Sequence, residues 1–305
     1  MAEHGRSLVG RGAELATFDT MLTALAGGRP SVVLLAGEPG IGKSRLLAEL
    51  GARADASRML VLAASASEFE QDLPFWLFVE ALDEYLRAVG PELLDGLADV
   101  GADLAEVLPS WPAPAGAAPQ RGDPRYRTHR AVRRLLETLS AAAPLALLLD
   151  DLHWADSGSV ELICALLRRP PVGPVLIGMA ARPRQTGRRL TAGLERAQAA
   201  GLVTRLELGP LSMPDARELL GAAVGGKDAA ALYAESGGNP FYLGQLARTR
   251  RDVSPTVVAR PPGDDVPPTV TIAMSDELAL LDPDTRRVLE GAAVAGDPFV
   301  LELVA

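Results

Sequence analysis

Cysteine is almost missing from this sequence of 305 residues, because Cys164 is the only one and no disulfide can form within the chain. Long apolar runs are missing too, and none approaches the roughly 18 residues that a membrane-spanning helix requires. The first residues do not show the pattern of a secretory leader, and we expect none. These absences exclude a disulfide-stapled secreted scaffold and a membrane-spanning protein. We expect the chain to work in the reducing cytoplasm, without a membrane partner.

Aromatic residues and lysines are also scarce. Aromatics make up 4% of the residues and hydrophobic residues 48%, so the core must consist mainly of leucine, valine and alanine. Lys43 and Lys227 are the only lysines, and every other cationic side chain is an arginine. The formal net charge is −9 and the isoelectric point is about 5.0. Because an acidic surface repels phosphate backbones, we expect no non-specific binding to nucleic acid.

Short apolar runs alternate with helical patterns over the first two thirds of the sequence. The apolar runs predict five buried strands, at 31–37, 59–64, 145–149, 174–180 and 203–208. Apolar residues at helical spacing predict helices between them, at 43–54, 74–89, 126–140, 157–168 and 189–200. Strands that alternate with helices form parallel sheets covered on both faces. The predicted fold class is therefore α/β, with a five-stranded parallel sheet flanked by helices.

Residues 37–44, GEPGIGKS, fit the P-loop pattern G-x-x-x-x-G-K-[ST] between a predicted strand and a predicted helix. The glycines let backbone N–H groups point at phosphates, and the helix start adds a partial positive charge. We expect Lys43 to reach the β- and γ-phosphates of ATP and the Ser44 hydroxyl to ligate Mg²⁺. The nucleotide should also contact the neighbouring residues of the loop, Glu38, Pro39, Gly40, Ile41, Gly42 and Arg45. The alternative is a glycine-rich turn without a ligand.

Residues 145–151, LALLLDD, form an apolar strand that ends in two carboxylates. Beside a P-loop, the first carboxylate, Asp150, can hold Mg²⁺ through water. The second, Asp151, can orient and polarise the attacking water. The alternative is that one aspartate only caps the strand end or starts a turn.

Three segments together resemble the STAND class of AAA+-related signalling ATPases, namely the P-loop, LALLLDDLHWAD at 145–156 and GGNPFYLGQL at 237–246. The likeness is strongest to the ATPase region of large LuxR-type transcriptional regulators. The opening LVGR at 8–11, with Glu14 and Leu15 after it, fits the box that precedes the P-loop in that class. The resemblance covers about residues 7–305 and implies a P-loop NTPase fold with a helical lid and the start of a winged-helix domain.

The resemblance implies roles for residues outside the two main motifs. Those expected near the adenine are Val9, Gly10 and Arg11. Arg182, which ends the fourth strand, would sense the γ-phosphate, as suits a guanidinium group. Pro240 would pack on the base. The alternatives are an exposed N-terminal turn, a solvated arginine, and an ordinary helix start with Asn239 as N-cap.

The few histidines and the single cysteine do not indicate a metal site. Three histidines and one cysteine, which are His4, His129, His153 and Cys164, form no zinc constellation. We interpret His153 as a packing or hydrogen-bonding residue and Trp154 as part of the core. Asp156 is expected to be the N-cap of the next helix.

The predicted strands stop after residue 209. We assign residues 1–209 to a nucleotide-binding α/β domain and 210–249 to a lid of short helices. The lid helices are expected at 214–224, 228–235 and 240–248.

A proline-rich linker is expected at 250–268, followed by an incomplete winged-helix-like segment at 269–305. Only 37 residues follow Pro268 (305 − 268), which is too few to complete such a domain. We expect an ATPase fragment of a longer regulator that binds DNA only through a C-terminal domain outside this chain.

Two functions compete on these observations. The first is a slow ATPase that acts as a switch, in which ATP or ADP controls conformation and self-association. The second is an energy-transducing AAA+ ATPase, such as a remodeller or an origin-recognition-like DNA-binding ATPase. That second function needs an arginine finger, and nothing marks one among its candidates, Arg184, Arg188, Arg189 and Arg196. A non-hydrolysing scaffold and a small-molecule kinase are weaker alternatives.

Overall fold

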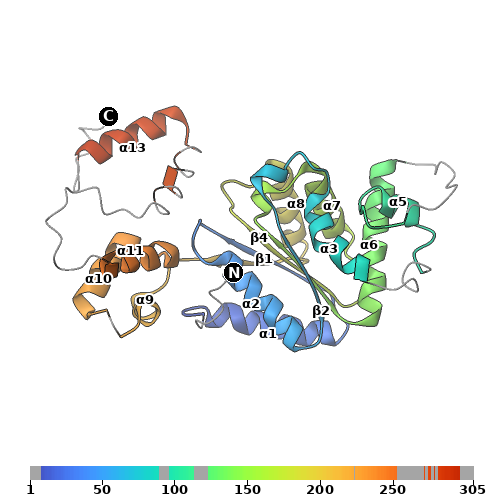
Figure 1. Cartoon of the computed structure of the whole chain (residues 1–305), viewed down its shortest axis with the longest axis horizontal. Coiled ribbons are helices and arrows are strands. Elements are labelled where there is room, and N and C mark those ends of the chain that lie inside the picture. Colours follow the sequence, from blue (N-terminus) through green and yellow to red (C-terminus); the bar gives the residue numbers. More distant parts are fainter. Residues whose placement is uncertain are drawn as a thin grey trace. The chain divides into compact units, whose positions relative to one another are not determined.

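A computed structural model describes residues 8–88, 96–112, 123–222 and 224–252, together with 271, 274–275, 278 and 281–295. The chain divides into two compact units, residues 1–209 and 210–305 (Figure 1). Among the described residues, no helix combines the length and the apolar character needed to cross a bilayer.

The first unit contains one parallel sheet of five strands in the order β2-β3-β4-β1-β5. The strands are β1 (Ser31–Gly37), β2 (Leu60–Ser65), β3 (Leu145–Asp150), β4 (Val175–Ala181) and β5 (Thr204–Leu208). Because β4 lies between β1 and β3, the residues after these three strands meet at the carboxyl edge of the sheet. This edge is where ligands bind in open α/β sheets.

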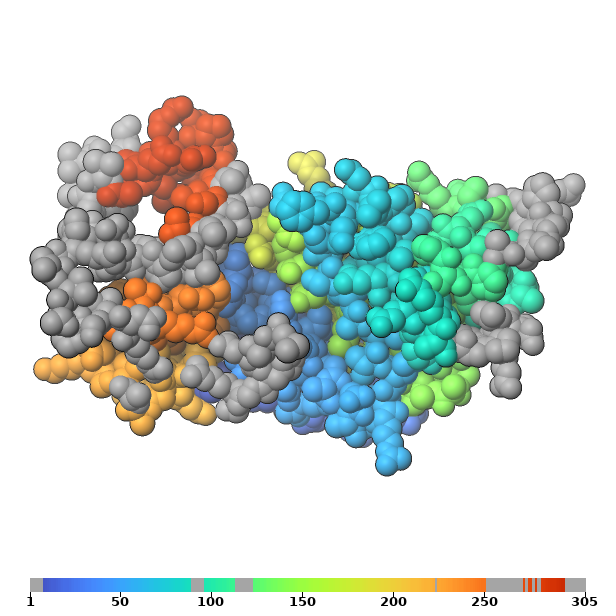
Figure 2. Space-filling model, viewed as in Figure 1, coloured from blue at the N-terminus to red at the C-terminus, as the bar shows by residue number. Residues whose placement is uncertain are grey.

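Helices cover both faces of the sheet, in agreement with the predicted α/β class. They are α1 (Gly12–Ala26), α2 (Lys43–Ala56), α3 (Trp76–Ala88), α5 (Gly101–Ala105), α6 (Pro124–Ala142), α7 (Ser157–Arg168) and α8 (Arg188–Ala199). Two short 3₁₀ turns, η1 (Glu68–Glu70) and η2 (Leu152–Trp154), follow β2 and β3. In the space-filling view, the described residues of the first unit run from blue through green to yellow (Figure 2).

The side chains of β1 alternate between two hydrophobic clusters. Val33 and Leu35 pack with α1 and α2 on one face. Val32 and Leu34 belong to the cluster on the other face, to which α3, α6, α7 and α8 contribute. This alternation is the period of two that strand geometry imposes. Both faces of the sheet are buried, which explains why the strand sequences are continuous apolar runs.

The second unit is helical in its described part. α9 (Met213–Leu220), α10 (Gly226–Ser236) and α11 (Pro240–Asp252) surround a small cluster that includes Leu211, Leu232 and Leu243. α13 (Pro283–Ala295) follows later in the chain.

Several predicted boundaries were wrong. The sequence patterns missed α1 entirely, because its apolar residues are separated by threonines that bond back to carbonyls four residues earlier. The linker was predicted to start at residue 250, but α11 continues to Asp252. Within this last turn of the helix, Arg250 pairs with Glu235. The rest of that linker, from residue 253, lies outside the described residues. So does most of the segment at 269–305 apart from α13.

Candidate nucleotide-binding site

The P-loop connects β1 to α2 at the carboxyl edge of the sheet. Gly40 and Gly42 have φ angles of 70° and 100°, which only glycine adopts without strain. A Cβ atom on Gly37 would lie 2.9 Å from the carbonyl oxygen of Leu208, so this position also requires glycine. Gly42 is the N-cap of α2, and because glycine has no side chain, no side-chain oxygen caps the first N–H groups of the helix. The first turn of α2 therefore presents its N–H groups and positive helix end to an anion.

Lys43 is almost completely buried, with 5% of its surface exposed. Its Nζ atom donates hydrogen bonds of 2.9 Å to the carbonyl oxygens of Gly37 and Glu38. A buried ammonium group costs free energy unless it is paired, and here the loop that it serves supplies the partners. The side chain is therefore held inside the P-loop.

Two aspartates follow the buried part of β3, as the sequence indicates. The Oδ1 atom of Asp150 accepts a 2.7 Å hydrogen bond from the backbone N–H of Asp151. Asp151 has φ 48° and ψ 43°, a left-handed conformation that is unusual for a residue other than glycine. Backbone strain of this kind clusters at functional sites.

Lys43, the two aspartates and Arg182 interact electrostatically, so the structure brings these predicted residues together. Burial lowers the pKa of Lys43 and nearby Arg182 lowers it further, while Asp151 and Asp150 oppose the change. Burial raises the pKa of Asp151 and Asp150 adds to this, while Arg182 and Lys43 oppose it. A raised pKa makes the Asp151 carboxylate a better proton acceptor.

Arg182 directly follows β4, and its Nη1 donates a 3.3 Å hydrogen bond to Oε1 of Gln185. The Nε atom of Arg182 is buried and has no hydrogen-bond partner within the described part of the chain. A buried donor without a partner suits an incoming acceptor such as a phosphate oxygen.

The geometry fits a hydrated Mg²⁺ ion better than a metal held by protein alone. In the described part of the chain, no three histidine, cysteine or acidic side chains group around a common point. Mg²⁺ keeps several waters and needs only one or two protein ligands beside the phosphates. An exposed Ser44 hydroxyl at the start of α2 and the Asp150 carboxylate supply that number.

His153 lies next to this group, and its side chain is 1% exposed. Burial lowers its pKa to about 3, and the charges of Arg182 and Lys43 contribute. Neither ring nitrogen has a hydrogen-bond partner among the described residues. His153 is therefore neutral and packs against Trp154, whose ring centroid is 5.1 Å away. Trp154 itself is half-buried against the core, and Asp156 is the N-cap of α7 as expected.

Arg11 contacts the P-loop from the segment before α1. One nitrogen, Nη2, donates to the carbonyl oxygens of Ile41 at 3.0 Å and Gly209 at 2.9 Å. Its Nη1 atom lies 3.4 Å from the Glu14 carboxylate. Arg11 is 7% exposed, so the alternative of an exposed N-terminal turn was wrong for this residue. Nothing in the sequence pattern indicates its bond to Gly209.

The other predicted contact residues lie around the loop or elsewhere. Glu38 and Arg45 are exposed, and the Glu38 carboxylate lies 3.7 Å from Nε of Arg184. Pro240 belongs to the second unit, where it begins α11 beside Asn239, whose Oδ1 accepts from the N–H of Phe241. The expected helix start is thus confirmed.

Comparison with curated proteins gives a relative of unestablished function. An uncharacterised protein of Rhizobium meliloti (strain 1021) is 30% identical over an alignment of 229 residues, and the alignment covers 70% of this chain. The aligned part is 21% of that protein, so the chain spans about a fifth of the relative's length.

Three solved structures are similar to this chain at low sequence identity. The Orc1 protein of Aeropyrum pernix in complex with DNA has 16% identity and a TM-score of 0.48, over 96% of this chain and 74% of that one. A RuvB mutant of Thermotoga maritima has 18% identity and a TM-score of 0.45, over 98% and 82%. A STAND protein with a tetratricopeptide repeat sensor from Pyrococcus horikoshii has 16% identity and a TM-score of 0.45, over 96% and 35%.

The family itself is set by the sequence match to the AAA ATPase domain, which spans residues 7–177. The matched residues include Arg11, the whole P-loop, and Asp150 and Asp151 at the end of β3. Because the match covers more than half of the chain, the chain belongs to the AAA ATPase domain family.

Proposed function

We propose that this chain is an ATP-binding, slowly hydrolysing signalling switch and the ATPase region of a LuxR-type transcriptional regulator. The bond of Arg11 to both Ile41 and Gly209 carries the proposal. Ile41 belongs to the P-loop, and Gly209 is the last residue before the second unit. A shift of the P-loop on nucleotide exchange would therefore alter the backbone at the point where the chain leaves the nucleotide-binding unit.

In the proposed switch, the residues of the site have separate roles. Lys43 exchanges the carbonyl oxygens of Gly37 and Glu38 for oxygens of the β- and γ-phosphates. Ser44 and Asp150 hold Mg²⁺, which supplies positive charge to the phosphates. Asp151 orients the attacking water and accepts its proton, a task that its raised pKa favours.

Arg182 senses the γ-phosphate through the guanidinium nitrogen that lacks a partner. ATP and ADP differ in this one phosphoryl group, so they bind with different strength to states that differ at Arg182. A ligand shifts a conformational equilibrium only through such differential affinity. Self-association in the ATP state follows if the second unit moves with Gly209.

Phosphate release from Mg²⁺-ATP tests the proposal, with Lys43→Ala and Asp151→Asn as variants. Lys227→Ala is a matched control, because Lys227 is the only other lysine and is exposed on α10. We expect slow turnover that does not depend on protein concentration, is lost in the first two variants and persists in the control. The sedimentation coefficient measured with ADP should differ from the one measured with a non-hydrolysable ATP analogue.

Two results would contradict the switch. Turnover that rises with protein concentration would mean that a neighbouring subunit completes the site, as in an energy-transducing AAA+ ATPase. Identical sedimentation with both nucleotides would remove the conformational response on which the proposal depends.

A further inference from the structure

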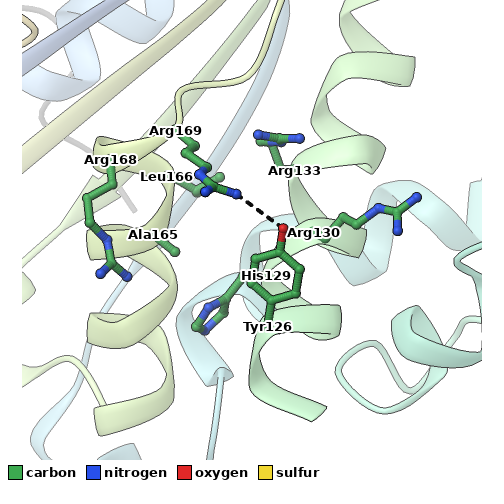
Figure 3. A pocket seen from close by; sticks show the side chains of 8 residues that line it. All are labelled: Tyr126, His129, Arg130, Arg133, Ala165, Leu166, Arg168 and Arg169. Atoms are coloured by element: carbon green, nitrogen blue, oxygen red, sulfur yellow. Dashed lines mark hydrogen bonds between the residues drawn. The ribbon is translucent and has the colours of Figure 1, made fainter. Parts of the chain in front are cut away.

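A second cleft lies on the first unit, between α6 and α7. It has a volume of about 340 Å³, within the range of small-ligand sites. Four of its lining residues are arginines, and two are aromatic or imidazole side chains: Arg130, Arg133, Arg168, Arg169, Tyr126 and His129. Figure 3 shows Tyr126 and His129 on α6 facing the end of α7, where Arg169 reaches across.

Positive charge is concentrated in this cleft although the whole chain carries a net charge of −9. Glu137 lies 3.6 Å from Arg133 and Asp99 lies 4.0 Å from Arg130. Within the described residues, neither Arg168 nor Arg169 has a carboxylate within 4.0 Å. The eight residues that line the cleft include four arginines and no carboxylate. Like charges held together raise the free energy of the cleft until an anion joins them.

Nε2 of His129 is buried without a hydrogen-bond partner among the described residues. Nε of Arg133 is also buried and makes no hydrogen bond there, but it lies 3.6 Å from the Glu137 carboxylate. Buried polar atoms in folded proteins nearly always find a partner, so each such atom calls for an explanation. An oxygen atom of a bound ligand would supply a hydrogen-bond partner. Burial lowers the pKa of His129, so its ring is neutral and can either donate to a ligand or accept from it.

The walls suit a ligand that carries more than an anionic group. The Tyr126 ring is exposed, its hydroxyl accepts a 3.1 Å hydrogen bond from Nη1 of Arg169, and this guanidinium lies 6.0 Å from the ring centroid. Ala165 and Leu166 provide an apolar floor. A flat or apolar body can lie against these surfaces while its anionic group meets the arginines.

We propose that the cleft between α6 and α7 is a binding site for a small organic phosphate monoester. A phosphate monoester carries a charge of about −1.5 to −2 at neutral pH, which suits a cleft lined by four arginines and no carboxylate. Guanidinium groups bind phosphate in a planar, bidentate manner. The site is separate from the P-loop, because none of its lining residues belongs to the loop or follows β1, β3 or β4 directly.

Isothermal titration with phenyl phosphate tests the site, in the presence of saturating Mg²⁺-ADP so that the P-loop does not take up the probe. The variant Arg133→Gln/Arg169→Gln removes two guanidinium groups that border the cleft. Glu137 keeps a partner in this variant, since it also accepts a 3.0 Å hydrogen bond from the N–H of Val172. Arg134→Gln is the control, because Arg134 is the next residue of α6, is exposed and does not line the cleft.

We expect the double variant to weaken phenyl phosphate binding by at least about tenfold, since a hydrogen bond to a charged group contributes more than a neutral one. Arg134→Gln should change the affinity less than about twofold. Inorganic phosphate and benzoate should both bind more weakly than phenyl phosphate, because each lacks either the apolar body or the second charge. The double variant should leave the turnover of Mg²⁺-ATP unchanged, because neither arginine lies at the P-loop, and this separates a failure of this site from a failure of the switch.

Any of three results would overturn the proposal. Equal weakening by Arg134→Gln and by the double variant would mean a general charge effect. Benzoate or inorganic phosphate binding as tightly as phenyl phosphate would rule out a phosphate monoester as the preferred ligand. Duplex DNA binding more tightly than phenyl phosphate, with loss in the double variant, would make the cleft part of a surface for polyanions.

Discussion

Replacing Arg11 with alanine separates two tasks that one side chain could perform. The variant removes the hydrogen bonds from Nη2 to Ile41 and Gly209 and the ion pair with Glu14. Because Arg11 is buried, water does not easily replace these bonds. The carbonyl oxygens of Ile41 in the P-loop and of Gly209 at the end of the first unit would lose a charged donor.

The size of the effect follows from these contacts. A hydrogen bond to a charged group contributes about 1.5 to 3 kcal/mol, and here one nitrogen serves two acceptors, so we expect a loss of about 3 kcal/mol. For a unit of this length, each kcal/mol shifts the melting temperature by roughly 2 to 4 °C, so Arg11→Ala should melt roughly 6 to 12 °C lower. Thermal unfolding without nucleotide measures this shift. Arg29→Ala, at an exposed position beyond the end of α1, is the control.

Nucleotide affinity decides between the two tasks of Arg11. If Arg11 only holds the P-loop to Gly209, Arg11→Lys should recover part of the stability, because the charge beside Glu14 remains. Nucleotide affinity should then follow stability across the variants. A melting temperature equal to that of the wild type, together with lost nucleotide binding, would refute this reasoning and make Arg11 a direct contact of the adenine nucleotide.

Two further predictions concern the interior of the first unit. His153 is neutral in the folded chain with a pKa of about 3, below its ordinary 6.5, so its contribution to stability is present above pH 6.5 and is lost as the pH falls toward 3. Urea unfolding at pH 7, 6 and 5 should show a slope of up to about 1.4 kcal/mol per pH unit that is absent in His153→Phe, and equal slopes would contradict the assignment. Gly178→Ala on β4 would place a Cβ atom 2.8 Å from Leu148 and 3.1 Å from Leu47. It should cost about 1 to 3 kcal/mol in the same assay, whereas an unchanged midpoint would mean that α2 can move away from the sheet.

The arrangement of strands and helices could be predicted from the sequence because both faces of the sheet are buried. Runs such as 145–149 are apolar throughout, and every one of the five predicted strands is present within one residue at each end. The P-loop and the paired aspartates were predictable for another reason. Their chemistry requires particular residue types at fixed spacing, so the pattern survives in the sequence.

The contacts that the sequence could not show join residues far apart in the chain. Arg11 and Gly209 are 198 residues apart, and no local pattern connects them. Arg127 and Asp103 likewise form an ion pair between α6 and α5, a helix that the sequence patterns did not predict. The left-handed backbone of Asp151 is set by the turn that leads into η2. Such features depend on how elements pack, which periodicity does not encode.

The outer strands of the sheet have a consequence for how copies of this chain could meet. Among the described strands, β5 pairs only with β1, and its Arg205 and Glu207 form an ion pair. At the other edge, the N–H of Ser65 on β2 donates to the Glu80 carboxylate of α3. Charged groups at strand edges oppose the joining of sheets between molecules. Joining of copies through the edges of the described sheet, and the growth of fibres from such sheets, are therefore disfavoured.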